Sequence, residues 1–532
     1  MFGIIVLAAY ALLMIGVTLI FTRRATSAES FHVADRRIGA TVAAMSIAAT
    51  WIWAPSLFTS SEMAYTRGVP GMFWFLVPNV LCLIIFIPFA KKIRRQYPEG
   101  ITLTGYMAER YRSPKVKGVY SFQLGALAVL STAVQLLAGG KTLALLTGLP
   151  FWSMTLALAA IAYSYARFSG IKASVATDVV QLGIILLSGA LLVTLGLRLT
   201  GGLETVQAGL GSISGEYTSL ISVSGVEVLL SFGLPTAVGL ISGPFGDQCF
   251  WQRTFSIRED RIGRSFFAAA LLFALVPIAM GTVGFLAAGS NFRAADAGMV
   301  NFEFVMSLLP AWVLVPFLVM AISGLLSTVD SNLCAAASLT TDWMTGEGAD
   351  NIRASRRVML ALLLVSILIA NIPGLTVTHL FLFYGTLRAS TLLPTVMTLL
   401  GKKLSAGGVF AGVLTALCVG LPIFAYGNIA GIPALKTAGS LTTVLSSGVV
   451  AVIASRKAVR TCAWVGNKAS PMKPGWRPLQ PSRARFPRRP WANLWPRPSR
   501  TSRPRQRAKR RPMPGAVVRT ALSLASSARP PA

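Results

Sequence analysis

Long hydrophobic stretches separated by short polar segments run along the chain to about position 455. Most are about 20 residues or longer, which is enough for a helix to cross a hydrocarbon layer about 30 Å thick. The pattern predicts an all-α polytopic membrane protein with about thirteen transmembrane helices. The predicted spans are 2–21, 39–64, 70–90, 119–146, 150–168, 173–198, 225–250, 264–289, 303–341, 356–372, 375–400, 406–426 and 437–455.

The composition supports the membrane setting and excludes several classes of function. Hydrophobic residues make up 54% of the chain and charged residues only 13%, which no water-soluble domain of this length shows. The five cysteines are dispersed and the two histidines isolated, so we expect neither a disulfide framework nor a metal site made from them. The sequence has no nucleophile–base arrangement and no nucleotide-binding loop. We therefore expect a protein that is not an enzyme and has no cofactor.

Lys and Arg residues gather in every second connection between the predicted spans, as the positive-inside rule requires of cytoplasmic loops. The alternation predicts a cell (inner) membrane protein with its amino terminus outside and its carboxyl end in the cytoplasm. The basic connections contain Arg23-Arg24, Arg36-Arg37, Lys91-Lys92 with Arg94-Arg95, Arg110 to Lys117, Arg167 with Lys172, Arg253 to Arg264, Arg353 to Arg357, Lys402-Lys403 and Arg456 to Arg460; the opposite ones hold only Arg67, Arg198, Arg293 and Lys436.

Residues 461–532 differ from the rest of the chain. They are rich in Arg, Pro, Ser and Ala, lack Asp and Glu, and contain 17 of the 49 Lys and Arg residues, so more than half of the net charge of +31 arises here. Such a segment cannot bury a core, and we predict a disordered basic tail. A basic tail can bind anionic lipid or nucleic acid. The abrupt change in composition instead favours an out-of-frame reading of GC-rich coding sequence, and we expect no nucleic-acid partner.

Two predicted spans contain helix-breaking residues near their middle. The second has the run Trp51-Ile52-Trp53-Ala54-Pro55, in which the proline removes a backbone donor and frees a carbonyl about four residues earlier. The seventh contains Pro235, Gly239, Gly243-Pro244 and Gly246. Interrupted helices at corresponding places in two halves of a chain are typical of transporters with inverted repeats. The predicted organisation is an extra helix and loop in 1–37, a ten-helix 5+5 inverted-repeat core in 38–403, two further helices in 404–460 and the tail in 461–532.

The run Gly324-Leu-Leu-Ser327-Thr328-Val-Asp330-Ser331 places hydroxyl groups inside an otherwise apolar span. Positions 324, 327 and 328 share one face of a helix, so a backbone carbonyl and two hydroxyls converge there. Neutral oxygen ligands suit a small hard cation such as an alkali ion. The alternative is a structural role, in which the hydroxyls form hydrogen bonds with their own helix or with a neighbouring one.

Four motifs together resemble the sodium:solute symporter family over roughly residues 1–455. They are Met45-Ser-Ile-Ala-Ala-Thr-Trp-Ile-Trp53, Ser169-Gly-Ile-Lys-Ala173 with Thr177-Asp-Val-Val-Gln181, Asp247-Gln-Cys-Phe-Trp-Gln-Arg253, and the run from Gly324 to Ser331. The resemblance implies a leucine-transporter-type core preceded by one extra helix. It further implies a sodium site made by the main-chain oxygens of Ala49, Ile52 and Gly324 and the hydroxyls of Ser327 and Thr328.

Two carboxylates lie within or at the end of predicted spans, where an ionisable group indicates a functional role. The resemblance implies that Asp178 assists release of the ion to the inside, and Asp330 serves the same exit or a second cation. A structural ion pair between Asp178 and Lys172 is the alternative.

The solute is expected beside the two helix breaks. Arg388 either contacts an anionic group of the solute or neutralises Asp247 or Glu62, and Arg253 is another possible partner of Asp247. The candidate lining residues are Trp51, Trp53, Gln135, Gly243, Asp247, Tyr384, Thr386 and Arg388.

The run Thr50-Trp-Ile-Trp, with Ser60-Ser-Glu-Met-Ala-Tyr65 and Gly71-Met-Phe-Trp74, is most similar to the urea and polyamine branch of the family. The run from Ser327 to Ser331 is more like that of sodium-coupled branches. We expect a sodium-coupled symporter that imports a small polar solute by alternating access, with Na+, the solute and the lipid bilayer as its partners. The alternatives are a proton-coupled or passive urea/polyamine-type transporter and a transporter-like sensor. The sequence specifies neither the solute nor the oligomeric state.

Overall fold

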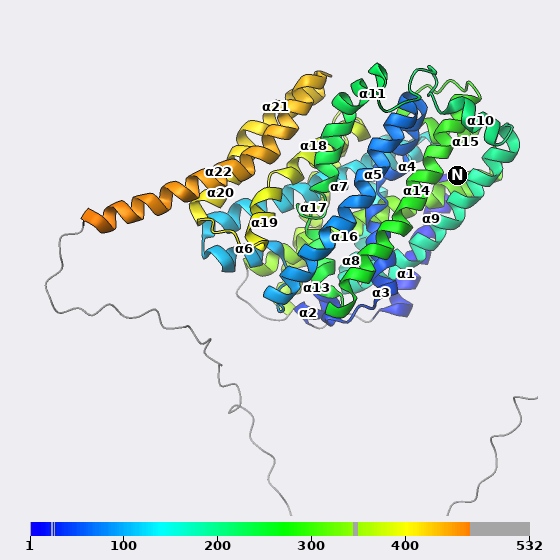
Figure 1. Ribbon diagram of the computed structural model, residues 1–532. Coiled ribbons are helices and arrows are strands. Elements are labelled where there is room, and N and C mark those ends of the chain that lie inside the picture. The colour runs from blue at the N-terminus through cyan, green and yellow to red at the C-terminus, as the bar shows by residue number, and fades with distance from the viewer. Residues whose placement is uncertain (1, 23–24, 26, 344–348, 469–532) are drawn as a thin grey trace, which may run out of the picture. The chain divides into compact units, whose positions relative to one another are not determined.

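The computed structural model describes residues 2–22, 25, 27–343 and 349–468. Its regular structure over these residues is helical, with a single isolated β-bridge between Ile38 and Ile257 (Figure 1). The all-α prediction is thus confirmed. The predicted tail begins inside the last helix, α22 (Pro433–Lys468), and its remainder, 469–532, lies outside the described residues.

Ten helices of the described part are long and apolar enough to cross a membrane, so the predicted number of thirteen is not confirmed. The other three predicted spans, 39–64, 150–168 and 356–372, are largely helical but are not among the ten. The ten candidates are Gly3–Phe21, Thr59–Gln96, Pro114–Thr147, Ile171–Thr200, Val223–Ile241, Glu259–Gly289, Ala311–Asp342, Val377–Leu399, Ala406–Ile429 and Pro433–Arg456.

The second and third predicted spans meet inside the element α5 (Thr59–Gln96), where two helices join at the non-helical residue Gly68. Gly68 has a φ of 54° and a ψ of −143°. Only glycine enters this region readily, and a Cβ at position 68 would lie 2.4 Å from the main-chain oxygen of Tyr217. A Cβ at Gly71 would lie 2.6 Å from the main-chain oxygen of Met63, so the chain turns back here and the predicted turn between the two spans is confirmed.

Both predicted helix breaks are present. In the first, α3 (Ala40–Trp51) ends two residues before the short helix α4 (Ala54–Leu57), which leads into α5. In the second, the chain has no helix between α12 (Leu234–Ile241) and α13 (Gln248–Ser256). A π-helical stretch, Leu229–Gly233, joins α12 to α11 (Val223–Val228).

The remaining helices pack around these two interrupted segments. α3 lies against α9 and α14, α16 lies against α7 and α9, and α18 lies against α7 and α12. The helices α20, α21 and α22 pack on one another at one side of the bundle (Figure 1). Their bounds are α1 Phe2–Phe21, α2 Ala28–Val33, α6 Leu103–Tyr111, α7 Pro114–Thr147, α8 Phe151–Ser169, α9 Ile171–Thr200, α10 Leu203–Gly209, α14 Ile262–Gly289, α15 Val300–Leu308, α16 Leu314–Leu339, α17 Ala349–Ala370, α18 Val377–Ala389, α19 Leu392–Leu399, α20 Ala406–Thr415 and α21 Leu421–Ile429.

Candidate cation and solute site

The break between α3 and α4 is held open by a neighbouring side chain. Ile52 has a φ of −83° and a ψ of 83°, and Trp53 is extended. Pro55 stands in the first turn of α4, where its missing N–H costs nothing. The N–H of Ala54 donates to Gln135 Oε1 at 2.7 Å. Gln135, predicted to line the solute site, is thus bound to the backbone of the break.

The hydroxyl face of α16 lies against this break. Thr328 Oγ1 is 3.1 Å from the main-chain oxygen of Thr50 and 3.2 Å from that of Gly324. A Cβ at Gly324 would lie 3.1 Å from the main-chain oxygen of Ile52, so only glycine lets the two segments approach this closely. The oxygens predicted for a sodium site therefore lie on two facing segments. The main-chain oxygen of Ala49 also accepts the N–H of Ile52 at 3.1 Å.

Asp178 of α9 adjoins this face and has a partner that the sequence did not indicate. Ser327 Oγ donates to its Oδ1 at 2.5 Å, and Ser46 Oγ donates to its Oδ2 at 2.5 Å. Arg253 Nη2 completes an ion pair with Oδ2 at 3.1 Å. The predicted alternative pairing with Lys172 is wrong, because the Lys172 ammonium pairs with Asp35 at 2.7 Å.

Arg253 is the main residue that sequence reasoning missed. Its Nε donates to Ser46 Oγ at 3.1 Å and its Nη2 to Ser331 Oγ at 2.7 Å, besides the pair with Asp178. It lies on α13 behind the second break and is 1% exposed. The sequence pattern placed Arg253 in a basic connection between predicted spans and suggested Asp247 as its partner. That pairing is wrong, because Asp247 pairs with Arg388.

Asp330 has hydroxyl groups as its partners, whereas Asp178 has two hydroxyl groups and the guanidinium of Arg253. Ser174 Oγ donates to its Oδ1 at 2.6 Å and Tyr165 Oη to its Oδ2 at 2.8 Å. Ser331 Oγ links this cluster to Thr50 Oγ1, from which it is 2.9 Å away. Tyr165 lies on α8, which carried no sequence signal for this role. The two carboxylates and one guanidinium thus share a continuous polar network beside the break.

Aromatic rings surround Arg388 of α18 on the other side of the break. The indoles of Trp51 and Trp53 stack with centroids 4.8 Å apart. The guanidinium carbon of Arg388 lies 5.2 Å and 4.8 Å from these two ring centroids and 4.8 Å from that of Tyr384. Its Nη2 pairs with Asp247 Oδ2 at 2.9 Å. Of the alternatives left open by the sequence, neutralisation of Asp247 is the one observed.

The remaining predicted lining residues make local contacts. Thr386 Oγ1 donates to the main-chain oxygen of Leu382 within its own helix at 3.1 Å. Gly243 leaves room for Trp51, since a Cβ there would lie 2.6 Å from the indole. Glu62 accepts a hydrogen bond from Thr378 Oγ1 at 2.7 Å instead of pairing with Arg388.

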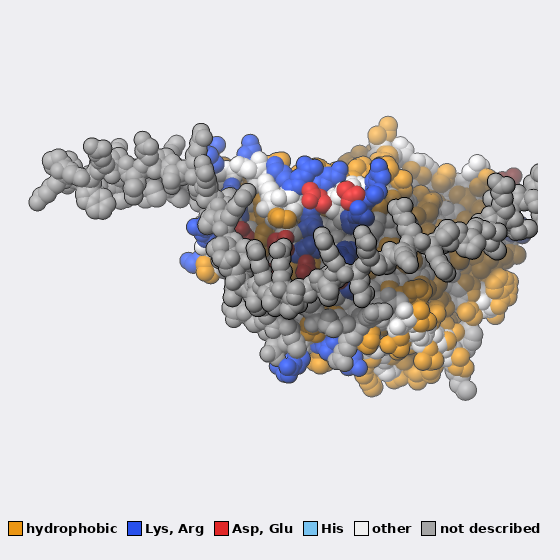
Figure 2. Space-filling model, turned by 90° about the horizontal axis from the view of Figure 1, so that it is seen from below, with side chains coloured by type: hydrophobic (Ala, Val, Ile, Leu, Met, Phe, Trp, Pro, Cys, Tyr) orange, Lys and Arg blue, Asp and Glu red, His pale blue; other side chains and the backbone are white. Residues whose placement is uncertain are grey.

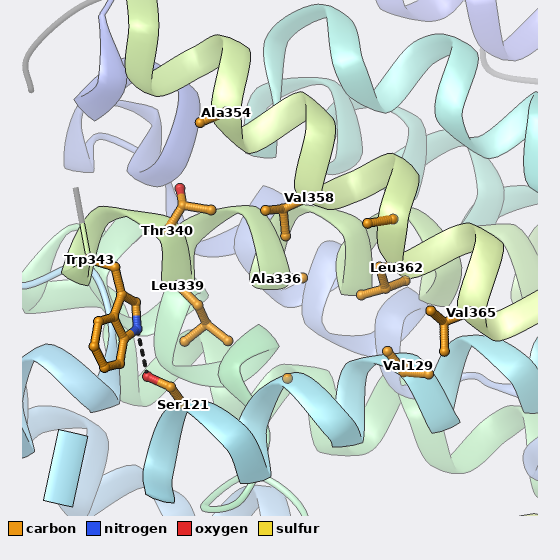
Figure 3. A pocket seen from close by; sticks show the side chains of 12 residues that line it. Ser121, Val129, Ala336, Leu339, Thr340, Trp343, Ala354, Val358, Leu362 and Val365 are labelled. Carbon is orange, nitrogen blue, oxygen red and sulfur yellow. Dashed lines mark hydrogen bonds between the residues drawn. The ribbon is translucent and has the colours of Figure 1, made fainter. Parts of the chain in front are cut away.

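The surface carries a basic cluster and an apolar groove. Lys and Arg side chains gather on the face shown in Figure 2, with a few acidic side chains among them. One surface hollow is lined by Arg36, Lys91, Arg95, Arg258, Glu259 and Asp260. A groove of about 600 Å³ lies between α7, α16 and α17, where Trp343 Nε1 donates to Ser121 Oγ at 3.0 Å (Figure 3). None of the predicted site residues lines this groove, so it is separate from the candidate site.

A sequence model of the sodium:solute symporter family matches residues 31–416. The chain belongs to the sodium:solute symporter family. Members of this family are membrane transporters, and the described residues contain ten helices that could span a membrane. The family prediction is confirmed, whereas the site residues and the predicted domain boundaries remain predictions.

Relatives with known names transport different solutes. A urea–proton symporter of Oryza sativa is 24% identical over 80% of this chain and 66% of its own length. A sodium/pantothenate symporter of Escherichia coli is 23% identical over 79% and 89%, and a spermidine transporter of Candida albicans is 25% identical over 70% and 70%. The chain spans only 42% of a probable urea transporter of Schizosaccharomyces pombe.

Two solved structures share the fold. A sodium-coupled sialic acid symporter in an outward-open state superposes with a TM-score of 0.68 at 15% identity, over 85% of this chain and 98% of that one. A nucleobase–cation symporter in a closed conformation gives a TM-score of 0.52 at 16% identity, over 81% and 95%. The leucine-transporter-type architecture is thereby confirmed.

Proposed function

We propose that this protein is a sodium-coupled symporter that imports a small polar solute across the cell membrane by alternating access. One observation carries the proposal. Gly324, Ser327 and Thr328 of α16 lie against the break between α3 and α4, where Ala49 and Ile52 present main-chain oxygens. Such oxygens can replace the hydration shell of an alkali ion.

The charge of the surrounding network favours a cation at this place. Asp178 touches Ser327 and is paired with Arg253, while Asp330 is bound by hydroxyl groups. When both carboxylates are ionised, the two negative charges and one guanidinium leave one negative charge unbalanced in a buried region. A buried charge without a counter-charge is costly, so a bound cation stabilises the network. We propose that Asp178 and Asp330 guide that ion along its exit.

Alternating access follows from the continuity of the broken segment. Ile52, which carries one of the proposed sodium ligands, lies between Trp51 and Trp53, whose rings border Arg388. An ion that orders the break therefore orders the solute site as well. By linkage, the solute must strengthen ion binding by the same factor.

The amino terminus is proposed to face outside. Lys and Arg side chains gather at the end of the bundle that holds α2 and α13, opposite α10 and α11 (Figures 1 and 2). Basic residues concentrate on the cytoplasmic side of membrane proteins.

Proton coupling is the second candidate. It is favoured by the name of the rice relative, a urea–proton symporter, and by the hydroxyl-bound carboxylate of Asp330, which could carry a proton in place of a bound cation. Passive transport of a urea-like solute is the remaining alternative.

Titration of the purified full-length protein with NaCl, at constant ionic strength maintained with KCl, tests the sodium site. A ligand that binds the folded state raises the melting temperature saturably. We expect this rise with sodium and not with potassium, and its loss in Ser327→Ala/Thr328→Ala. Thr142→Ala is the matched control, because the Thr142 hydroxyl bonds only within α7, to the main-chain oxygen of Ala138 at 3.0 Å.

Equal melting temperatures in the two salts, or an unchanged sodium response in the double variant, would contradict the proposed site. Uptake of radiolabelled urea into proteoliposomes that depends on a proton gradient and not on sodium would support the second candidate.

A further inference from the structure

The charges beside the solute site balance each other. Arg388 and Asp247 form an ion pair at 2.9 Å, and their side chains are 1% and 7% exposed. Asp247 Oδ1 also accepts the N–H of Cys249 at 2.9 Å, which fixes the carboxylate at the start of α13. The site therefore has no net charge before a solute arrives.

Several buried hydrogen-bond donors at this pair lack partners among the described residues. They are Nε and Nη1 of Arg388, Nε1 of Trp53 and Oη of Tyr384. A buried donor without an acceptor is energetically unfavourable. Two donors of the guanidinium itself, together with those of the two neighbouring aromatic residues, mark a place where a ligand oxygen can bind.

One acceptor nearby is also unpartnered. Asn79 accepts the indole N–H of Trp51 through its main-chain oxygen at 3.2 Å, while its Oδ1 has no partner in the described part of the chain. Donors therefore outnumber acceptors. A solute with a carbonyl oxygen and an N–H group matches this set.

We infer that the transported solute carries no net charge and presents an amide-type or urea-type carbonyl oxygen to Arg388, with the Arg388–Asp247 pair setting this selectivity. The inference rests on the proposed function and names the class of its solute. A carboxylate would place a second negative charge beside Asp247, and an ammonium would face the guanidinium. Either would add an unbalanced charge to a buried site.

The coupling ion does not alter this charge count. Its charge is balanced in the other network, where Asp178 is paired with Arg253 and Asp330 has the hydroxyls of Ser174 and Tyr165 as its partners. A solute need not bring a negative charge to compensate for the ion.

Family membership leaves the charge of the solute open. The named relatives transport urea, which is uncharged, spermidine, which is a cation, and pantothenate, which is an anion. The ion pair in this chain is the feature that decides among these classes.

Compounds of matched shape and different charge test the inference. The full-length protein in detergent, with sodium present, is given urea, guanidinium and acetate, then acetamide and ethylamine, then benzamide, benzoate and benzylamine. We expect uncharged members to raise the melting temperature at concentrations at least tenfold below those that the charged members need. A charged member that acts as well as its uncharged counterpart, or a set in which no uncharged member acts, overturns the inference.

Variants of the pair move the selectivity in a defined direction. Asp247→Asn leaves the guanidinium unbalanced, so we expect at least a tenfold shift towards the two carboxylates, acetate and benzoate. Arg388→Gln/Asp247→Asn restores neutrality and should again favour the uncharged member. Glu62→Gln, which removes a carboxylate bound to Thr378 and not to Arg388, should leave the charge preference unchanged. An unshifted preference in Asp247→Asn that still responds to sodium also overturns the inference.

The two proposals fail in different ways. If uncharged solutes stabilise the protein equally in sodium and in potassium, sodium coupling fails while the charge preference stands. If a carboxylate or amine enters proteoliposomes in a sodium-dependent manner in preference to its uncharged counterpart, the solute class fails while sodium coupling stands.

Discussion

Asp178–Arg253 and Asp247–Arg388 are both buried ion pairs, with nitrogen–oxygen distances of 3.1 and 2.9 Å, but their surroundings differ. All three guanidinium nitrogens of Arg253 have partners, whereas Nε and Nη1 of Arg388 have none among the described residues. Arg253 lies among hydroxyl groups and Arg388 among aromatic rings. The Asp178–Arg253 pair is therefore a structural ion pair beside the proposed cation site. The Asp247–Arg388 pair retains hydrogen-bonding capacity for a ligand.

The largest difference between the pairs should appear when each arginine is removed. Arg253→Met leaves Asp178 buried without its counter-charge, which costs about 3–5 kcal/mol. Arg388→Met also leaves a buried carboxylate, that of Asp247, without its counter-charge, but it removes two buried nitrogens that lack partners, so it should cost less stability. It should also abolish stabilisation by uncharged solutes. Thermal unfolding in detergent measures both effects.

A double variant that removes both charges distinguishes the contribution of the Asp178–Arg253 ion pair from that of the packing around it. Asp178→Asn combined with Arg253→Met should recover part of the stability lost in Arg253→Met, because no unpaired buried carboxylate remains. Equal losses of stability in Arg253→Met and Arg388→Met would remove the distinction between the structural ion pair and the ligand-binding ion pair.

The close contact between Gly324 of α16 and the break predicts the next largest effect, a loss of stability and of sodium binding. In Gly324→Ala the new methyl group would lie 3.1 Å from the main-chain oxygen of Ile52 and 2.8 Å from Leu57 Cδ1. Overpacking of this kind costs about 1–3 kcal/mol, and the displaced carbonyl should weaken the sodium response about tenfold or more. Gly183→Ala on α9 is the control, since no atom lies within 4 Å of its added Cβ. A sodium titration in which the two variants behave alike would argue against a cation between α16 and the break.

Two buried tyrosine hydroxyls give a smaller and more selective comparison. Tyr165→Phe removes a donor from Asp330, which should lower stability by about 1–3 kcal/mol. Tyr384→Phe removes a hydroxyl without a partner among the described residues, so stability should hardly change. Its effect should be a loss of about 1 kcal/mol in solute binding. Melting temperatures with and without an uncharged solute distinguish the two outcomes, and the reverse assignment would contradict the roles given to the pairs.

Local features of the site could be predicted from the sequence, and pairings across the fold could not. Pro55 and the glycines around Gly243 located both breaks, because their effect on the backbone is confined to a few residues. Lys172 appeared the natural partner of Asp178 because it precedes it on the same helix. The actual partner, Arg253, is 75 positions away, and Arg388 is 141 positions from Asp247. Helix packing decides these contacts, and no local pattern encodes it.

The number of spans shows the same limit. Hydropathy located the apolar stretches and the turn at Gly68 that separates two of them, but three of the thirteen predicted spans are not among the ten candidate membrane helices of the described residues. The basic character of one end of the bundle, by contrast, followed directly from the sequence, since it is a property of composition.

The smallest expected effect concerns His32 of α2, which contacts α13, the helix that carries Arg253. Its main-chain oxygen accepts a hydrogen bond from Gln252 at 2.8 Å, and its ring Nε2 lies 3.3 Å from Ser355 Oγ. Burial lowers the pKa of His32 from 6.5 to about 4. The unfolded chain therefore binds a proton that the folded protein does not, and stability falls as the pH drops from about 6.5 towards 4.

The loss should be about 1 kcal/mol at pH 5.5 and should be absent from His32→Gln, measured as the difference between the two melting-temperature profiles. Because His32 contacts α13 and not α18, the loss should affect the sodium response before it affects the preference for uncharged solutes. A pH step that is identical in the variant would assign it to other groups. A step confined to solute binding would place the pH-sensitive group at the Arg388 pair instead.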